Sequence, residues 1–223
     1  MKKIIFFSLI IMCCIEANAQ NFQLHGGIVY PTGDFANYDT NDRAGNATTG
    51  FNFGIKSYLP LSNSNLLLSF GFDFFYNGPQ SKYKEIFDLL DYDYSPSVYL
   101  NMPLTVGLNY SYSLYKKFKI YGEAGLGLNY SMMTSDAIRF WVSPHYYYSK
   151  SVYDNSFGFC YNLEGGFLLK WFRLGLKYNY LGKYNYKTNW LLTDNYGEEI
   201  DSEKLDDTKR IITNLQLVIG FVF

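Results

Sequence analysis

The sequence predicts an all-β fold, an antiparallel up-and-down barrel of eight strands in meander order. Three observations predict it. Apolar and polar residues alternate with period two along eight segments, so successive side chains point to opposite faces of each segment. Aromatic residues make up 20% of the chain, and the abundant Tyr and Phe favour strands. The connections between segments alternate between long and short, which is typical of up-and-down barrels with an even number of strands.

The first residues have the features of a secretory signal peptide. Two lysines precede an apolar stretch, 4–15, and small residues follow at Ala17 and Ala19, which predicts cleavage before Gln20. We therefore expect a signal peptide at 1–19 and one barrel domain at 20–223.

The charge and cysteine content of the mature chain exclude few classes of protein. Removing the signal takes two of the 19 basic and one of the 20 acidic residues, which leaves 17 and 19, a formal net charge of −2. This balance gives no indication of nucleic-acid binding. Cys160 is the only cysteine of the predicted mature chain, so a disulfide within one molecule is excluded.

The expected strands follow from the alternation. They are 22–30, 50–59, 66–77, 97–110, 118–130, 156–169, 172–183 and 210–223. Long loops are expected at 36–49, 78–95, 131–155 and 186–209, with one or two helical turns within 85–90. No run of about 20 apolar residues follows the signal, so a membrane-spanning mature chain has to be a closed barrel.

The apolar face of the strands is expected to point outward. A soluble barrel with an apolar interior is the alternative, but roughly forty large apolar side chains exceed what the interior of eight strands can hold. Glycines also gather on the polar face, where they make room inside a narrow barrel. They are Gly54, Gly71, Gly107, Gly125, Gly127, Gly158, Gly166, Gly175 and Gly220.

The last strand carries the most specific signal. Its apolar face consists of Leu215, Leu217, Ile219, Phe221 and the terminal Phe223. It resembles the closing strand of bacterial outer-membrane β-barrels, in which a terminal aromatic residue and alternating apolar residues form the assembly signal.

The whole expected mature chain is similar to the eight-stranded outer-membrane β-barrel family of Gram-negative bacteria, the porin-family or OmpA/OmpX-type barrels. The resemblance implies an integral protein of the bacterial outer membrane, with both termini in the periplasm and long loops outside. Its expected partners are outer-membrane lipid and, through the last strand, the barrel-assembly machinery; a monomer is expected. No peptidoglycan-binding domain is seen after the barrel, so an anchoring role is not implied.

Charged residues on the polar face are the first candidate site. They are Lys56, Asp73, Lys119, Glu123, Glu164, Arg173 and Lys177. They could line an ion pathway. A plug of paired charges is favoured, because an unpaired buried charge is costly and eight strands leave little free lumen.

Catalytic and metal sites are not indicated. Small outer-membrane barrels include lipid-modifying enzymes, but neither His25 nor His145 has a serine and an acid at a spacing that defines a triad. The two histidines and Cys160 show no metal-ligand spacing, and the acidic segment 194–207 lacks the EF-hand pattern. We therefore expect no catalytic residues, no metal and no cofactor.

Aromatic residues in the loop 131–155 are the second candidate site. They are Trp141, Tyr146, Tyr147 and Tyr148. They fit a surface that binds a partner or a glycan, and equally the outer aromatic girdle of a barrel, which is slightly favoured. The predicted function is a structural or surface-binding role through the long loops. The first alternative is a narrow channel for small or hydrophobic solutes, and the second is an enzyme that modifies lipid.

Overall fold

The computed structural model describes residues 21–37, 45–61, 65–79, 89–90, 92–142, 145–194 and 196–223. The predicted signal peptide with Ala17, Ala19 and Gln20, and most of the helical segment expected at 85–90, lie outside these ranges. No helix among the described residues is long and apolar enough to cross a membrane.

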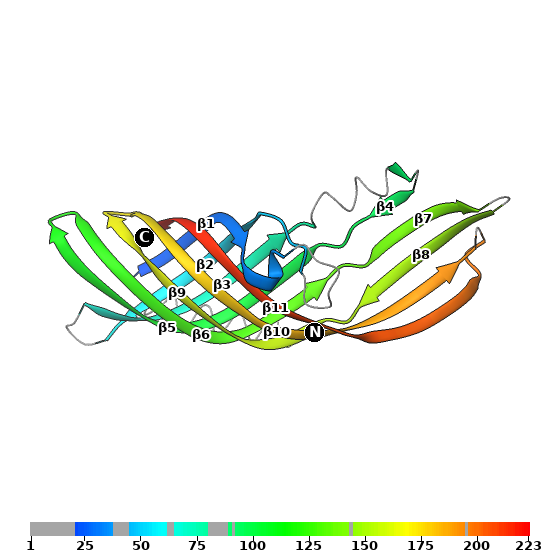
Figure 1. The fold of residues 1–223 in the computed structure, drawn as a ribbon. Coiled ribbons are helices and arrows are strands. Elements are labelled where there is room, and N and C mark those ends of the chain that lie inside the picture. Colours follow the sequence, from blue (N-terminus) through cyan, green and yellow to red (C-terminus); the bar gives the residue numbers. More distant parts are fainter. Residues whose placement is uncertain are drawn as a thin grey trace.

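Eight strands form a closed antiparallel barrel, as predicted (Figure 1). They are β1 (Asn21–Pro31), β2 (Gly50–Pro60), β3 (Leu66–Asn77), β5 (Tyr99–Tyr115), β6 (Phe118–Met133), β9 (Ser156–Leu169), β10 (Phe172–Thr193) and β11 (Glu199–Val222). Each pairs with the next in this order, and β11 also pairs with β1, from Gln23↔Val222 to Pro31↔Asn214. This last pairing closes the barrel and removes the open edges that a flat sheet would expose.

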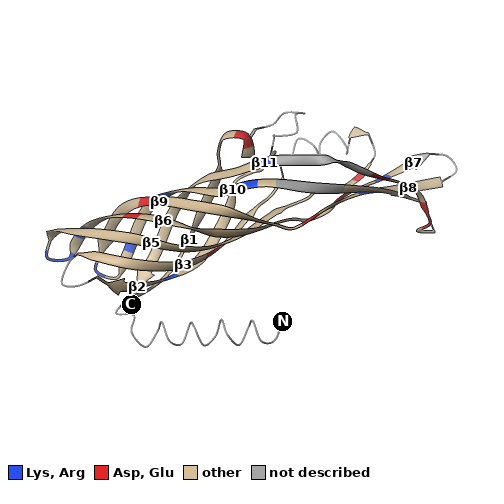
Figure 2. Ribbon diagram, turned by 90° about the horizontal axis from the view of Figure 1, so that it is seen from below, with Lys and Arg blue, Asp and Glu red and all other residues tan. Residues whose placement is uncertain are grey.

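The polar face of the barrel points inward and the apolar face outward, as predicted. Leu104, Leu126 and Phe157 on the outer face are 64%, 61% and 74% exposed, whereas Asp73 and Asn101 on the inner face are fully buried. Most of the barrel ribbon in Figure 2 carries no charged residue. Glycine makes the inner packing feasible: a Cβ at Gly127 would overlap the carbonyl oxygen of Leu104.

Beyond the barrel, the same sheet continues as an extension, the external sheet, which the sequence analysis did not predict. The regions 131–155 and 186–209, expected as loops, contain β7 (Asp136–Val142), β8 (His145–Tyr153) and the outer halves of β10 and β11; β4 (Asp93–Ser95) adds a short strand. The order across this external sheet is β11–β10–β8–β7–β4. Figure 1 shows it leaving one end of the barrel as a long ribbon.

The loop prediction failed because segments from two different expected loops pair with each other as strands. Thr188 to Thr193 of β10 pair with Tyr153 to Tyr148 of β8. These segments mix polar, charged and aromatic residues on both faces, so period-two alternation is absent even though the backbone is extended.

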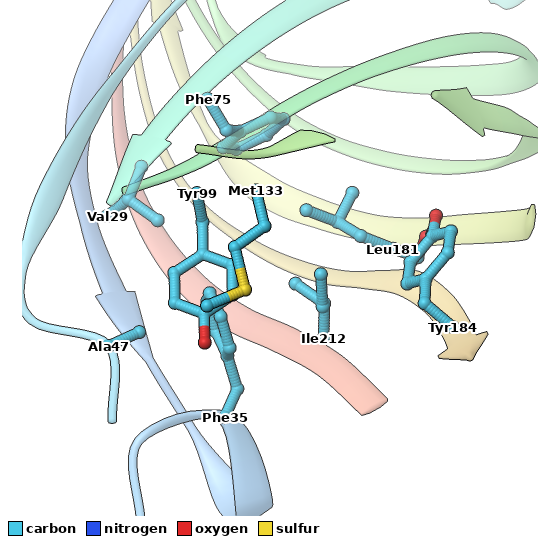
Figure 3. Packing of buried hydrophobic residues seen from close by; sticks show 9 residues of the cluster. All are labelled: Val29, Phe35, Ala47, Phe75, Tyr99, Met133, Leu181, Tyr184 and Ile212. Carbon is cyan, nitrogen blue, oxygen red and sulfur yellow. The ribbon is translucent and has the colours of Figure 1, made fainter. Parts of the chain in front are cut away.

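An apolar cluster closes the barrel at the end that bears the external sheet. The 3-10 turn η1 (Gly33–Phe35) places the fully buried Phe35 ring edge-on against Tyr99, with ring centroids 5.0 Å apart. Tyr99 Oη donates a hydrogen bond of 2.6 Å to the carbonyl oxygen of Gly45. Figure 3 shows the nine residues of this apolar cap, which are Val29, Phe35, Ala47, Phe75, Tyr99, Met133, Leu181, Tyr184 and Ile212.

Candidate functional site

A cluster of four charges fills the lumen toward the short turns. Lys56 Nζ lies 2.7 Å from a carboxylate oxygen of Glu123 and 2.7 Å from one of Glu164. Arg173 Nη2 lies 2.9 Å from each of the same two carboxylates. All four side chains are at least 95% buried. Each cation therefore bridges two anions and each anion two cations, which is the arrangement that offsets the desolvation of buried charge.

Tyrosine side chains surround this four-charge cluster. Arg173 Nη1 donates to the hydroxyl oxygen of Tyr58 at 2.5 Å, and that hydroxyl lies 2.6 Å from Gln23 Oε1 and can donate to it. Tyr121 donates to Glu164 at 2.8 Å, and its ring lies 3.6 Å from the guanidinium carbon of Arg173. The aromatic rings occupy the space that would otherwise be left beside the ion pairs.

A second ionic group lies nearby in the lumen. Lys177 Nζ is 2.8 Å from Asp73 Oδ2, and His25 Nε2 is 2.7 Å from Asp73 Oδ1. Asn52 Nδ2 also donates to Asp73 Oδ1 at 2.8 Å, and Asn52 Oδ1 accepts a hydrogen bond from Gln216. With His25 set aside, the two groups together hold three cationic and three anionic side chains, and each of these six has an ionic partner.

Six of the seven charged residues predicted for the lumen are thus brought together, and Lys119 is not. Lys119 lies at the second position of β6 and is exposed. Alternation placed it correctly on the face shared by Tyr121 and Glu123, but that face reaches solvent at the end of the barrel. Its removal from the set turns an expected excess of one cation into an even balance.

No catalytic or metal-binding role was expected for the two histidines and Cys160. His25 Nε2 is bonded to Asp73, and Nδ1 has no hydrogen-bond partner among the described residues. His145 is exposed at the start of β8. Cys160 is a buried free thiol, and the described residues contain no group of three His, Cys, Asp or Glu side chains placed to hold a metal.

The aromatic face of the closing strand lies on the outside of the barrel, by the short turns. Leu215, Ile219, Phe221 and Phe223 are exposed, and Leu217 is partly so. The Phe221 ring stacks on Trp171, with centroids 5.4 Å apart. The backbone amide of Phe223 donates to the carbonyl oxygen of Phe22 at 2.7 Å, so the last residue still takes part in closing the barrel.

The four aromatic candidates of the second predicted site lie on the β7–β8 hairpin of the external sheet. Trp141 packs against Tyr146, with ring centroids 4.5 Å apart, and Tyr146, Tyr147 and Tyr148 line a pocket of about 430 Å³. The hairpin lies beyond the closed barrel (Figure 1), whereas a girdle would encircle the barrel wall. The structure places these residues on strands that extend beyond the barrel, and the girdle interpretation stays a prediction.

Arg139 also lines this pocket, and the sequence analysis missed it. It lies opposite Asp93 of β4 and Tyr148 of β8 in the strand register, so the three side chains share one face of the sheet. Its guanidinium carbon lies 4.6 Å from the centre of the Tyr146 ring. A charged residue followed directly by Phe140 and Trp141 was the available signal, but only strand pairing shows that Asp93 lies beside Arg139.

The opposite face of the hairpin holds the external sheet in shape. Trp190 Nε1 of β10 donates to Ser149 Oγ of β8 at 2.7 Å, and Tyr153 donates to Asp136 Oδ1 at 2.6 Å. Burial raises the pKa of the Asp136 carboxyl above its ordinary value, and the hydrogen bond from Tyr153 acts in the other direction. Burial and the adjacent Asp136 also raise the pKa of the Tyr153 hydroxyl.

No protein-family model and no curated protein matches the chain. Among solved structures it is similar to a major outer membrane protein from Thermus thermophilus, with 11% identity, a TM-score of 0.51, and coverage of 91% of this chain and 99% of that chain. It is also similar to Neisserial surface protein A (12% identity, TM-score 0.47, 91% and 94% covered) and to the outer membrane protein OprG from Pseudomonas aeruginosa (15%, 0.47, 92% and 97%). The chain therefore has the closed β-barrel fold of outer-membrane proteins.

Proposed function

We propose that this protein is an integral protein of the bacterial outer membrane, in which a barrel closed to solutes holds a binding surface outside the membrane. The filled lumen is the observation that carries this proposal. Two ionic groups lie at one level and the apolar cap at another, and both are built from buried side chains.

The outer wall supports residence in a membrane. Large apolar side chains are exposed along neighbouring strands of the barrel, where a soluble protein would hide them. They include Phe51, Phe53, Phe72, Leu104, Val106, Leu126, Leu128, Phe159, Leu163 and Leu176. Both ends of the barrel chain lie on the side of the short turns, because Phe22 and Phe223 exchange backbone hydrogen bonds there. In a bacterial barrel that side faces the periplasm and the long connections face outward.

The external sheet supports the binding role. β10 and β11 remain paired up to Thr193↔Glu199, and β8, β7 and β4 extend the same sheet. One of its faces carries the exposed aromatic residues Trp141, Tyr146 and Tyr148 together with Arg139, and such groups are common anchors of binding surfaces. A barrel that only filled space in the membrane would not need this ordered extension.

Conductance of the folded protein in a planar bilayer tests the closed lumen. We expect no steady openings from the native protein, from Phe35→Ala or from Arg173→Ala, because each single change leaves the other closure in place. The double variant is expected to leak. Lys119→Ala is the matched control, because it removes a charge on the same face outside the network.

Steady openings of the native protein, with an amplitude that changes in Arg173→Ala and not in Lys119→Ala, would overturn the proposal. The ionic groups would then line a narrow channel instead of closing it.

A further inference from the structure

The pocket on the external sheet has the groups of a ligand site and a held shape. It measures about 430 Å³, within the range typical of small-molecule sites, and the small Ala137 is among its lining residues. Asp93 and Ser95 of β4 and Asp194 at the end of β10 contribute its polar lining. Strand pairing fixes the backbone beneath these groups, because β4, β7 and β8 are hydrogen-bonded in register.

Two charged groups of the pocket, Arg139 and Asp194, have polar atoms available to bind another molecule. Arg139 forms no ion pair with any described residue, and its guanidinium carbon lies over the Tyr146 ring, 4.6 Å from the ring centre. Among the described residues, no hydrogen-bond acceptor engages its N–H groups, so these groups are able to donate to another molecule. Asp194 Oδ1 accepts the backbone amides of Tyr196 and Glu198, each at 2.9 Å, which holds the carboxylate while Oδ2 stays available.

The chemistry of the lining selects among ligand classes. A phosphate-rich ligand would meet two carboxylates for one guanidinium, and a cationic ligand would meet the guanidinium of Arg139. A purely apolar ligand would leave all of these charged groups without a partner. A sugar offers hydroxyls that both donate and accept, together with flat C–H faces. Tyr146 and Tyr148, 43% and 42% exposed, present ring surface for such faces.

We infer that this pocket binds a carbohydrate, with Arg139 and the two aspartates bonding sugar hydroxyls and Tyr148 packing against a ring face. The inference rests on the proposed binding role of the external sheet and names its ligand class. One chemistry has two sources here: the carbohydrate of a lipid in the same membrane, or a glycan from outside the cell.

The test uses the full chain in detergent against an array of neutral, acidic and amino oligosaccharides. Intact lipopolysaccharide in bicelles and the oligosaccharide released from it by mild acid are measured beside the array. We expect binding to one of these carbohydrates that weakens about tenfold or more in Arg139→Ala and in Tyr148→Ala. Arg139→Lys keeps the charge but loses the planar group, and should weaken binding as well. Tyr115→Ala, an exposed tyrosine at the other end of the barrel, should bind like the native protein.

The outcomes separate the sources. Competition by the released oligosaccharide against intact lipopolysaccharide supports the site and assigns a membrane source, whereas binding to array sugars alone supports it with an external source. No binding to any carbohydrate, binding that survives both alanine substitutions, or binding to intact lipopolysaccharide that the released oligosaccharide does not inhibit would overturn the inference. Preference for simple amines over sugars would overturn it too.

The failure of this inference is distinguishable from that of the proposed function. A protein that is silent in the bilayer and binds no sugar retains its closed lumen and loses only the ligand class. A protein that conducts steadily but binds sugar through Arg139 retains the pocket and loses the closed lumen.

Discussion

Two arginines, one in the barrel and one in the external sheet, each lie over the ring of a tyrosine, but their ionic partners differ. Arg173 in the lumen lies over Tyr121, touches two carboxylates and donates to Tyr58. Arg139 in the external sheet lies over Tyr146 and has no ion pair among the described residues. The first is consumed by a structural network, while the second retains donors for another molecule. Arg173 therefore contributes to the stability of the barrel, whereas the free donors of Arg139 support the proposed binding role of the external sheet.

The largest expected effect comes from breaking the four-charge cluster. Glu164→Ala leaves Lys56 and Arg173 with one shared carboxylate in a buried site, and removing one partner of a buried ion pair costs about 3–5 kcal/mol. The free energy of unfolding, measured by urea titration in lipid vesicles, should fall by that amount. Lys119→Ala should change it by less than about 0.5 kcal/mol, because the side chain is exposed. Equal losses in the two variants would contradict the structural role given to the cluster.

Two glycines on β6, one on each face, allow the inner and outer faces to be compared by Gly→Ala substitution. The expected changes in the free energy of unfolding are smaller than for Glu164→Ala. Gly127→Ala would drive a methyl group into the backbone at Leu104, and overpacking of this kind costs about 1–3 kcal/mol. Gly122, on the outer face, has nothing within 4 Å of an added Cβ. Gly122→Ala should therefore stabilise the strand by about 0.5–1 kcal/mol, since glycine loses more backbone freedom on folding. The same vesicle titration measures both, and a gain in Gly127→Ala would refute the packing argument.

The barrel could be predicted from the sequence because its strands obey a local rule. Alternation along β3 and the last part of β11 tells which side chains face the lumen, and glycines on that face report its narrowness. Alternation tells which face of a strand a side chain occupies, but not how far along the barrel axis it lies. Lys119 was therefore assigned to the buried set. The rule also fails wherever both faces of a strand meet water, as in β7 and β8.

The candidate sites depended on contacts between distant residues and were predictable only in part. The lumen charges were found because strand parity collects them on one face. Tyr58, Tyr121 and Phe35 were missed, since tyrosine on an inner face and phenylalanine in a turn have no distinctive local pattern. Arg139 needed the pairing of β4 with β7, and no local pattern predicts the pairing of a three-residue strand.

The smallest effect concerns the pH dependence of the external sheet. Because burial raises the pKa of Asp136 in the folded hairpin, the folded state favours the protonated form relative to the unfolded chain. The stability that this provides is fully present below the ordinary carboxyl pKa, about 3.9. It is lost as the pH rises through the raised value.

Asp136→Asn resembles the protonated form and still accepts the hydrogen bond from Tyr153, so the hairpin should keep its acid stability at neutral pH. The expected difference, of the order of 1 kcal/mol or less, is measured by amide hydrogen exchange in 136–153, corrected for intrinsic rates, between pH 4 and pH 7. A native hairpin that gains protection as the pH rises through this window, or a variant that keeps the native pH dependence, would show that another group controls it.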